Sequence, residues 1–196
     1  MAPLLRRMET EPAKKIRSLL GRFRRNRDGS TAVEFAMVGI PFFMLIFGIL
    51  EIGIVFLAMQ MMDNAVQDTA HLIKTGQAQT DGISKAEFKE AVCAGLPGFM
   101  SGGAGCERLY VDVQKFNTFA DINNVNTTIV NGDGEINDDT GYDVGNSGEI
   151  VLVRAYYAWP MITNVIKESF ADLADGSRLL MSAAAFRNEP FPEVGG

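Results

Sequence analysis

The residue whose position most suggests chemistry is a carboxylate at the start of a long apolar stretch. Glu34 follows Gly29 after four intervening residues in the segment GSTAVEF, and Phe35 comes directly after it. An ionised side chain inside a membrane is costly unless an opposite charge neutralises it. A carboxylate near a helix N-terminus is also favoured by the helix dipole, without any functional role. Glu34 is therefore a candidate for charge pairing.

Side chains that commonly carry enzyme catalysis are sparse. His71 is the single histidine, and it stands between Ala70 and Leu72. No serine occurs in a G-x-S-x-G motif, and no two carboxylates form a recognisable catalytic pair. The acidic C-terminal part argues against nucleic-acid binding. We therefore predict a protein that is not an enzyme and that has no cofactor, small-molecule substrate or nucleic-acid partner.

The two cysteines are a second candidate site. Cys93 and Cys106 are too far apart for a C-x-x-C redox motif and too few for a zinc site. They predict a disulfide if this part of the chain is exported, and two buried thiols if it is cytosolic. The segment between them is rich in glycine but lacks the G-K-[ST] ending of a phosphate-binding loop. We expect it to be a flexible connection.

An acidic loop over residues 121–148 is the third candidate, because sixteen of its 28 residues are Asn, Asp or Gly. Asn131, Asp133 and Glu135 are weak candidates for calcium ligands, since calcium prefers clustered oxygen atoms. The EF-hand pattern fails, because glycine is absent from the sixth position and Glu from the twelfth. We therefore favour a mobile, turn-rich surface loop without a metal.

The apolar stretch that begins at Glu34 is long enough to cross a membrane. Residues 35–50 carry no charge, and a bilayer core of about 30 Å needs about 20 helical residues. We predict a transmembrane helix over residues 30–57, with a kink at Pro41. A buried helix of a soluble protein is disfavoured because so small a chain has little with which to surround it. A cleaved secretory signal is disfavoured because no A-x-A-like site follows.

The charges on either side of this stretch predict its orientation. Residues 1–28 hold nine Lys and Arg against three acidic residues, so they carry +6 and the rest of the chain −12, which gives the net charge of −6. Because basic segments remain in the cytoplasm, we predict a single-pass inner-membrane protein. Its basic leader, residues 1–29, would be cytoplasmic and its C-terminal domain periplasmic.

The same residues resemble known pilus proteins. A glycine, four residues and a carboxylate opening an apolar helix resemble the processing site of type IV prepilins. GSTAVEFAMVGIPFFMLIFGILEIG, followed by AMQMMDNAVQDTAHLIKTG, is similar to the TadE-like family of tight-adherence pilus systems. The resemblance is close over residues 27–76 and looser in the tail, where FRNEP (residues 186–190) is family-like. It does not extend to residues 117–148.

The resemblance implies cleavage between Gly29 and Ser30 by a prepilin peptidase, a membrane-embedded aspartic peptidase. The product would be a minor pilin or pseudopilin that acts with other pilins and pilus assembly proteins. The cut would remove the basic leader and create an α-amino group on Ser30, with a pKa near 8. Glu34 lies one helical turn further on the same face. We expect an ammonium of the same or a neighbouring subunit to neutralise Glu34 and to set the register between helices.

Beyond the span, the pattern predicts an α+β head over residues 77–196. A helix extension over 58–76 should carry one buried stripe and end at Gly76. The stripe comprises Met59, Met62, Val66, Thr69 and Ile73. Ser84 and Glu87 match a capping box that opens a helix ending near Cys93. Strands are expected over residues 109–113, 150–159 and 179–186, in a small, mainly antiparallel sheet, with a helix over 162–173.

Two matters stay open at the level of sequence. The runner-up interpretation is an uncleaved, membrane-anchored periplasmic module with a binding or structural role, which holds calcium through the acidic loop. The second open matter is Glu51, which we expect within a turn or two of the outer membrane boundary. Its partner is not evident from the sequence.

Overall fold

The computed structural model describes residues 30–103, 105–125, 129–138, 140–162, 167 and 170–192. The basic leader with Gly29, much of the helix expected over 162–173 and parts of the acidic loop lie outside the described residues. The chain divides into two compact units, residues 1–47 and 48–196. Each unit is described by itself below.

A 45-residue helix, α2 (Ser30–Lys74), contributes to both units. Within the first unit, nearly every described side chain of α2 is exposed, including large apolar ones such as Phe35 (71% exposed) and Met37 (74% exposed). Among the described helices, only this one is long and apolar enough to cross a membrane, by length and composition. An isolated helix with an apolar surface on all sides is what a lipid environment requires.

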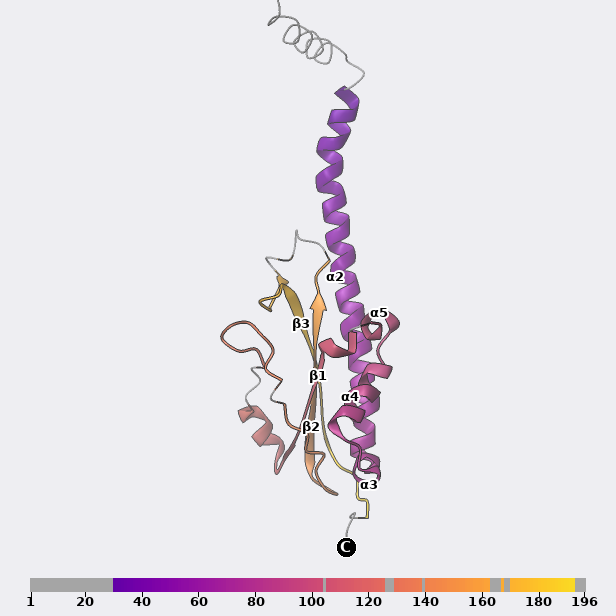
Figure 1. The fold of residues 1–196 in the computed structure, drawn as a ribbon, viewed down its shortest axis with the longest axis vertical. Coiled ribbons are helices and arrows are strands. Elements are labelled where there is room, and N and C mark those ends of the chain that lie inside the picture. The colour runs from indigo at the N-terminus through magenta and orange to yellow at the C-terminus, as the bar shows by residue number, and fades with distance from the viewer. Residues whose placement is uncertain are drawn as a thin grey trace, which may run out of the picture. The chain divides into compact units, whose positions relative to one another are not determined.

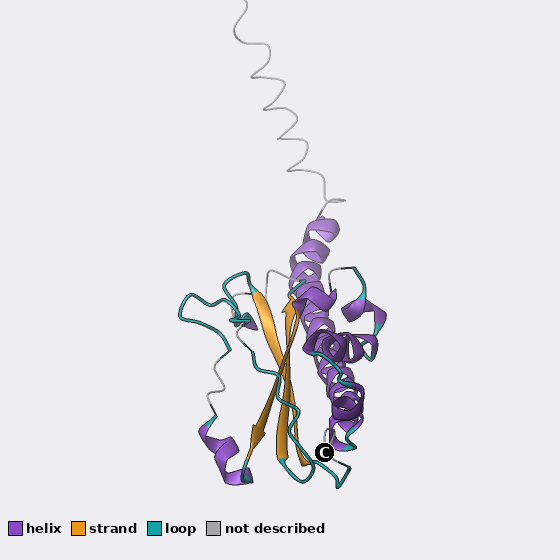
Figure 2. Cartoon of the chain, turned by 60° about the horizontal axis from the view of Figure 1, so that its bottom comes forward, coloured by secondary structure: helices purple, strands orange, loops and turns teal. Residues whose placement is uncertain are grey.

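The second unit is the α+β head that the sequence predicts. Its other elements are α3 (Gln77–Asp81), α4 (Lys85–Ala94), α5 (Gly98–Ser101), η2 (Gly105–Arg108), β1 (Leu109–Phe116), η3 (Phe119–Asn124), β2 (Ile150–Pro160) and β3 (Ser177–Arg187). The strands form one sheet in the order β1-β2-β3, and both pairs are antiparallel. The head part of α2, together with α3, α4 and α5, lies on one side of this sheet (Figures 1 and 2).

The register of the sheet explains how its core forms. Val111 pairs with Ala155, and Val113 pairs with Val153, which in turn pairs with Ala184 of β3. Side chains of paired residues share a face, and these five belong to the same buried cluster as the stripe on α2. Of the predicted stripe, Met62, Val66, Thr69 and Ile73 are buried and Met59 is half-buried. The small residues Ala58, Ala65 and Ala70 widen the stripe and are also buried.

The helix ends where the sequence predicts. Lys74 is its last residue, and Gly76 adopts the left-handed conformation with φ of +81°. Glycine is the residue that adopts this conformation at little cost. A side chain at this position would also collide with the ring of Phe191, which lies 2.5 Å from the position of a Cβ atom. The predicted capping box is confirmed as well, because the Ser84 side chain and the Glu87 backbone N–H are bonded, as are the Glu87 side chain and the Ser84 N–H.

Two segments that we expected to be loosely held are packed against the head. The glycine-rich stretch after Cys93 is not a flexible connection, because it forms α5 and buries Met100 completely. Part of the acidic loop extends the sheet beside β1, where Val113 exchanges two backbone hydrogen bonds with Gly141 and Asp143. This extension pairs the backbone groups of β1 at Val113, on the open edge of the sheet.

Candidate processing and assembly site

The structure describes helix α2 from Ser30 onward, and Ser30 is the residue that would follow the predicted cut. Gly29 lies outside the described residues. Glu34 stands one turn into the helix with its side chain exposed, and Phe35 beside it is 71% exposed. The first turns of the helix therefore present a carboxylate and an aromatic ring on the surface of the first unit.

An apolar groove follows directly after Glu34 along the same helix. Phe35, Gly39, Phe43 and Phe47 recur every four residues and line the groove together with Ala36, Ile40 and Met44. The ring of Phe35 lies over Gly39, 3.7 Å from the position that a Cβ atom would take. The rings of Phe43 and Phe47 have centroids 6.5 Å apart. The groove offers shape and apolar area to a neighbouring helix, which is how helices associate in lipid.

Pro41 lies inside α2 and does not end it. Proline leaves one backbone carbonyl of the preceding turn without its helical partner. The kink that we expect there stays a prediction.

Glu51 is buried in the head, with 3% of its surface exposed. Its Oε1 accepts a hydrogen bond of 2.6 Å from the backbone N–H of Ile162, just after the end of β2. A bond from a backbone N–H satisfies a carboxylate that would otherwise be costly to bury. The partner that the sequence left open is thus a backbone group of the same chain, 111 residues away.

A small apolar cavity lies beside Glu51 in the head. Ile52, Val55, Phe56 and Met59 of α2 line one part of it, and Met161, Phe170 and Arg178 line the other. The Arg178 guanidinium stands 5.6 Å from the centre of the Phe170 ring. Glu51 and Ile52, which lie within the range 30–57 expected for the span, therefore already contact the rest of the head.

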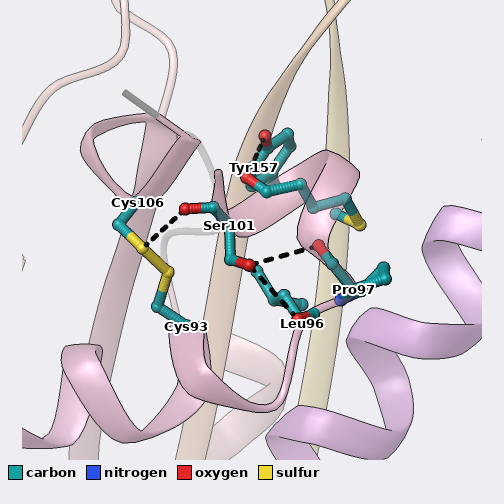
Figure 3. The surroundings of a disulfide bond; sticks show 7 residues. Cys93, Leu96, Pro97, Ser101, Cys106 and Tyr157 are labelled. Carbon is teal, nitrogen blue, oxygen red and sulfur yellow. Dashed lines mark hydrogen bonds between the residues drawn. A yellow bond between two sulfur atoms is a disulfide. The ribbon is translucent and has the colours of Figure 1, made fainter. Parts of the chain in front are cut away.

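The predicted disulfide between Cys93 and Cys106 is confirmed, with their Cα atoms 5.8 Å apart. It joins the end of α4 to η2 and encloses α5 (Figure 3). The Met100 carbonyl of the enclosed segment accepts a 2.9 Å hydrogen bond from the hydroxyl of Tyr157 in β2. Closing a loop of about 14 residues stabilises a fold by roughly 3 kcal/mol, mainly by restricting the unfolded chain.

A buried ion pair that the sequence analysis missed lies across the first two strands. Asp112 and Arg154 are paired in the register of β1 and β2, and Arg154 Nη2 lies 2.6 Å from Asp112 Oδ2. Both side chains are almost fully buried, at 3% and 6% exposure. The other carboxylate oxygen accepts a 2.8 Å hydrogen bond from the Gly141 N–H. The pair thus anchors the extension of the acidic loop to the sheet.

Asn131, Asp133 and Glu135, the weak candidates for calcium ligands, form a turn. Asn131 Oδ1 accepts hydrogen bonds from the backbone N–H groups of Asp133 and Glu135, at 3.0 and 2.9 Å. This is the arrangement by which asparagine fixes a turn. Within the described parts of the chain, no group of three His, Cys, Asp or Glu residues could hold a metal ion. The described hydrogen bonds of Asn131 thus belong to a turn, and the calcium interpretation stays a prediction.

The family-like segment FRNEP binds the C-terminal tail to the end of α2 through hydrogen bonds. Asn188 is buried, and its side-chain amide donates to the carbonyl groups of Val144 and Asn146. The Glu189 N–H donates to the Lys74 carbonyl at 2.8 Å, which satisfies a carbonyl of the last helical turn. The segment joins three parts of the head that are distant in sequence.

Four titratable groups in the described part of the head have shifted pKa values, and for two of them, Tyr156 and Tyr157, burial raises the pKa of the hydroxyl. The hydrogen bonds that Glu87 accepts from Ser84 in the capping box lower the pKa of its carboxyl. Burial beside Phe88 raises the pKa of the Tyr142 hydroxyl to about 12, with a smaller contribution from the charge of Glu87. His71, the single histidine of the sequence, is exposed on α2.

Residues 29–71 match the family model described as TadE-like protein. The match begins at Gly29 and covers most of α2, including Glu34 and Glu51. The predicted resemblance to the TadE-like family is confirmed over this segment. No curated protein and no solved structure shows a significant match to the chain.

Proposed function

We propose that this protein is a minor pilin or pseudopilin of a tight-adherence pilus, cleaved after Gly29 by a prepilin peptidase. The observation that carries the proposal is the position of Glu34 relative to the family match. The TadE-like match starts at Gly29, and Glu34, five residues after that glycine, stands exposed on the long apolar helix α2. A pilin-like role is structural, so we propose that the protein is not an enzyme.

The membrane arrangement follows from the charges and the helix. The long apolar helix α2 would anchor the chain in the inner membrane, with the basic leader in the cytoplasm because basic segments are retained there. The head would then be periplasmic, a compartment in which the disulfide between Cys93 and Cys106 persists. Other pilins and pilus assembly proteins would be the partners.

Cleavage would prepare the helix for assembly in two ways. It would remove the nine basic residues of the leader, and it would leave a protonated α-amino group on Ser30. That ammonium, or the one on a neighbouring subunit, would lie within a turn of Glu34 along a helix surface. Neutralising the carboxylate would allow helices to pack through the apolar groove that begins at Phe35.

The test is a charge-removing substitution that keeps size. Glu34→Gln should still be cleaved but should strongly reduce pilus assembly, because the ammonium loses its partner. Asp63→Asn is the matched control, since Asp63 is an exposed carboxylate further along the same helix. Cleavage is followed by the change in mass and assembly by counting pili in a complemented deletion strain. Normal piliation by Glu34→Gln would contradict the role given to this residue.

A further inference from the structure

We propose that the membrane-near end of the head sits in the headgroup layer of the bilayer, held there by a collar of exposed apolar side chains. The collar comprises Ile54, Phe56 and Leu57 of α2, Phe99 of α5, and Ile162 after β2. The proposal rests on the membrane anchoring proposed above. It adds a lipid surface as a direct partner of the head.

The level of the membrane boundary follows from Glu51. The charge-free run ends at Leu50, and Glu51 is withdrawn into the head through its bond to the Ile162 N–H. Twenty-one residues from Ser30 to Leu50 span about 31 Å of helix, which matches a hydrocarbon core of about 30 Å. The hydrocarbon therefore ends beside Glu51, and the hydrogen bond holds Ile162 at that level.

The α2 part of the collar begins within the headgroup layer at Ile54 and reaches its outer limit at Leu57. This layer is about 5 to 8 Å thick on each side of the hydrocarbon core. Ile54 and Leu57 follow Leu50 by four and seven residues, which is about 6 to 10 Å along the helix. Phe56 is 67% exposed and Leu57 50% exposed, and Ile162 is 71% exposed. Large apolar side chains at this depth gain by contact with the boundary between headgroups and acyl chains.

The directions of the collar side chains favour a bilayer over a protein partner. Successive helical residues are rotated by about 100°, so Ile54, Phe56 and Leu57 point to different sides of α2. Ile162 comes from the connection after β2, and Phe99 packs edge-on against Trp159 of that strand, with ring centroids 6.1 Å apart. A protein partner docks on one side, whereas a bilayer surrounds all of these side chains at one level.

The chain offers a direct optical test, because Trp159 is its only tryptophan. The Trp159 indole N–H has no hydrogen-bond partner among the described residues, so Trp159→Phe removes no such bond. In that background, Ile162→Trp places the probe in the collar. Phe119→Trp is the control, because Phe119 is similarly exposed (51%). Phe119 follows the end of β1 that pairs with Ile150, at the opposite end of the sheet from Pro160.

Both full-length variants are reconstituted in vesicles of phosphatidylethanolamine and phosphatidylglycerol, with lipids brominated in the upper part of the acyl chain as quenchers. We expect a blue-shifted spectrum and at least severalfold stronger quenching for the Ile162→Trp variant than for the Phe119→Trp variant. Circular dichroism checks that both variants are folded. Equal quenching of the two probes in vesicle-bound protein would overturn the collar and leave the anchor intact. A protein that fails to float with the vesicles would overturn the anchor as well.

Discussion

Buried charges in the head are satisfied by partners distant in the sequence. Glu51 binds a backbone N–H 111 residues away, and Asp112 binds the Arg154 side chain 42 residues away. The sequence marks both arginine and carboxylate as interruptions of apolar runs, but it does not show the strand register that joins them. The sequence therefore shows that charged residues interrupt these apolar segments. It does not show which groups they bind, because that depends on the tertiary fold.

The ion pair gives a prediction at the residue scale. Asp112→Asn should lower the free energy of unfolding by about 3 to 5 kcal/mol, because it leaves the buried Arg154 charge without its carboxylate. The double variant Asp112→Leu with Arg154→Met should recover most of this loss, since it removes both charges. Denaturant unfolding of the full chain in detergent micelles, followed by Trp159 fluorescence, measures the effect.

An exposed ion pair between Lys115 of β1 and Asp143 provides the control. Lys115 and Asp143 lie 3.4 Å apart with their side chains about half exposed. Lys115→Gln should change the free energy of unfolding by less than about 1 kcal/mol, because solvent screens the pair. If Asp112→Asn and Lys115→Gln lower the free energy of unfolding equally, the buried pair does not contribute more to stability than the exposed one.

Tyr142 gives a prediction about alkaline stability. Its hydroxyl is buried without a hydrogen-bond partner among the described residues, and its pKa rises from 10.0 to about 12. Folding therefore favours the protonated form, and this contribution is complete below pH 10 and is lost as the pH rises to about 12. Tyr142→Phe should match the wild type at pH 7 and unfold less readily above pH 10.

The measurement is a series of thermal melts from neutral to alkaline pH. Tyr110→Phe controls for the loss of a tyrosine hydroxyl, because Tyr110 is half-buried in β1. If the Tyr142→Phe melts follow the wild type at every pH, burial of this hydroxyl does not limit alkaline stability.

At the scale of elements, local signals were predicted well and non-local ones were not. The stripe on α2, the left-handed Gly76 and the capping box at Ser84 each depend on residues within one or two turns. The packing of α5 depends on Met100 meeting Tyr157, 57 residues later. The extension beside β1 depends on Gly141 meeting Asp112, 29 residues earlier. Composition alone favoured loops in both places.

The contact between α2 and the end of α4 gives a prediction at this scale. A Cβ atom on Gly95 would lie 2.9 Å from the Ala65 Cβ and 3.3 Å from its Cα. Gly95→Ala should therefore push the end of α4 away from α2 and cost about 1 to 3 kcal/mol in the free energy of unfolding. Denaturant unfolding measures this cost.

Gly98 offers a matched control three residues further along the chain. Nothing lies within 4 Å of a Cβ atom built on Gly98, and alanine favours a helix more than glycine does. Gly98→Ala should leave the stability unchanged or raise it slightly. A Gly95→Ala variant as stable as Gly98→Ala would contradict the close packing of α2 on α4.

At the scale of the whole molecule, one helix has two environments. Its first part presents an apolar surface on every side, whereas its second part buries one stripe against the sheet of the head. This change of pattern was visible in the sequence, since the apolar run, interrupted only at Glu51, gives way to spaced apolar residues from about Gln60 onward. The contact of Glu51 with the head was not visible, because it depends on Ile162, which follows β2.

The central claim is that Ser30 becomes the first residue of the working protein. Intact-mass spectrometry of the protein extracted from membranes of a piliated strain tests it directly. We predict a mass that lacks residues 1–29, with Ser30 at the N-terminus. A piliated strain whose protein keeps the basic leader from Met1 would contradict the account.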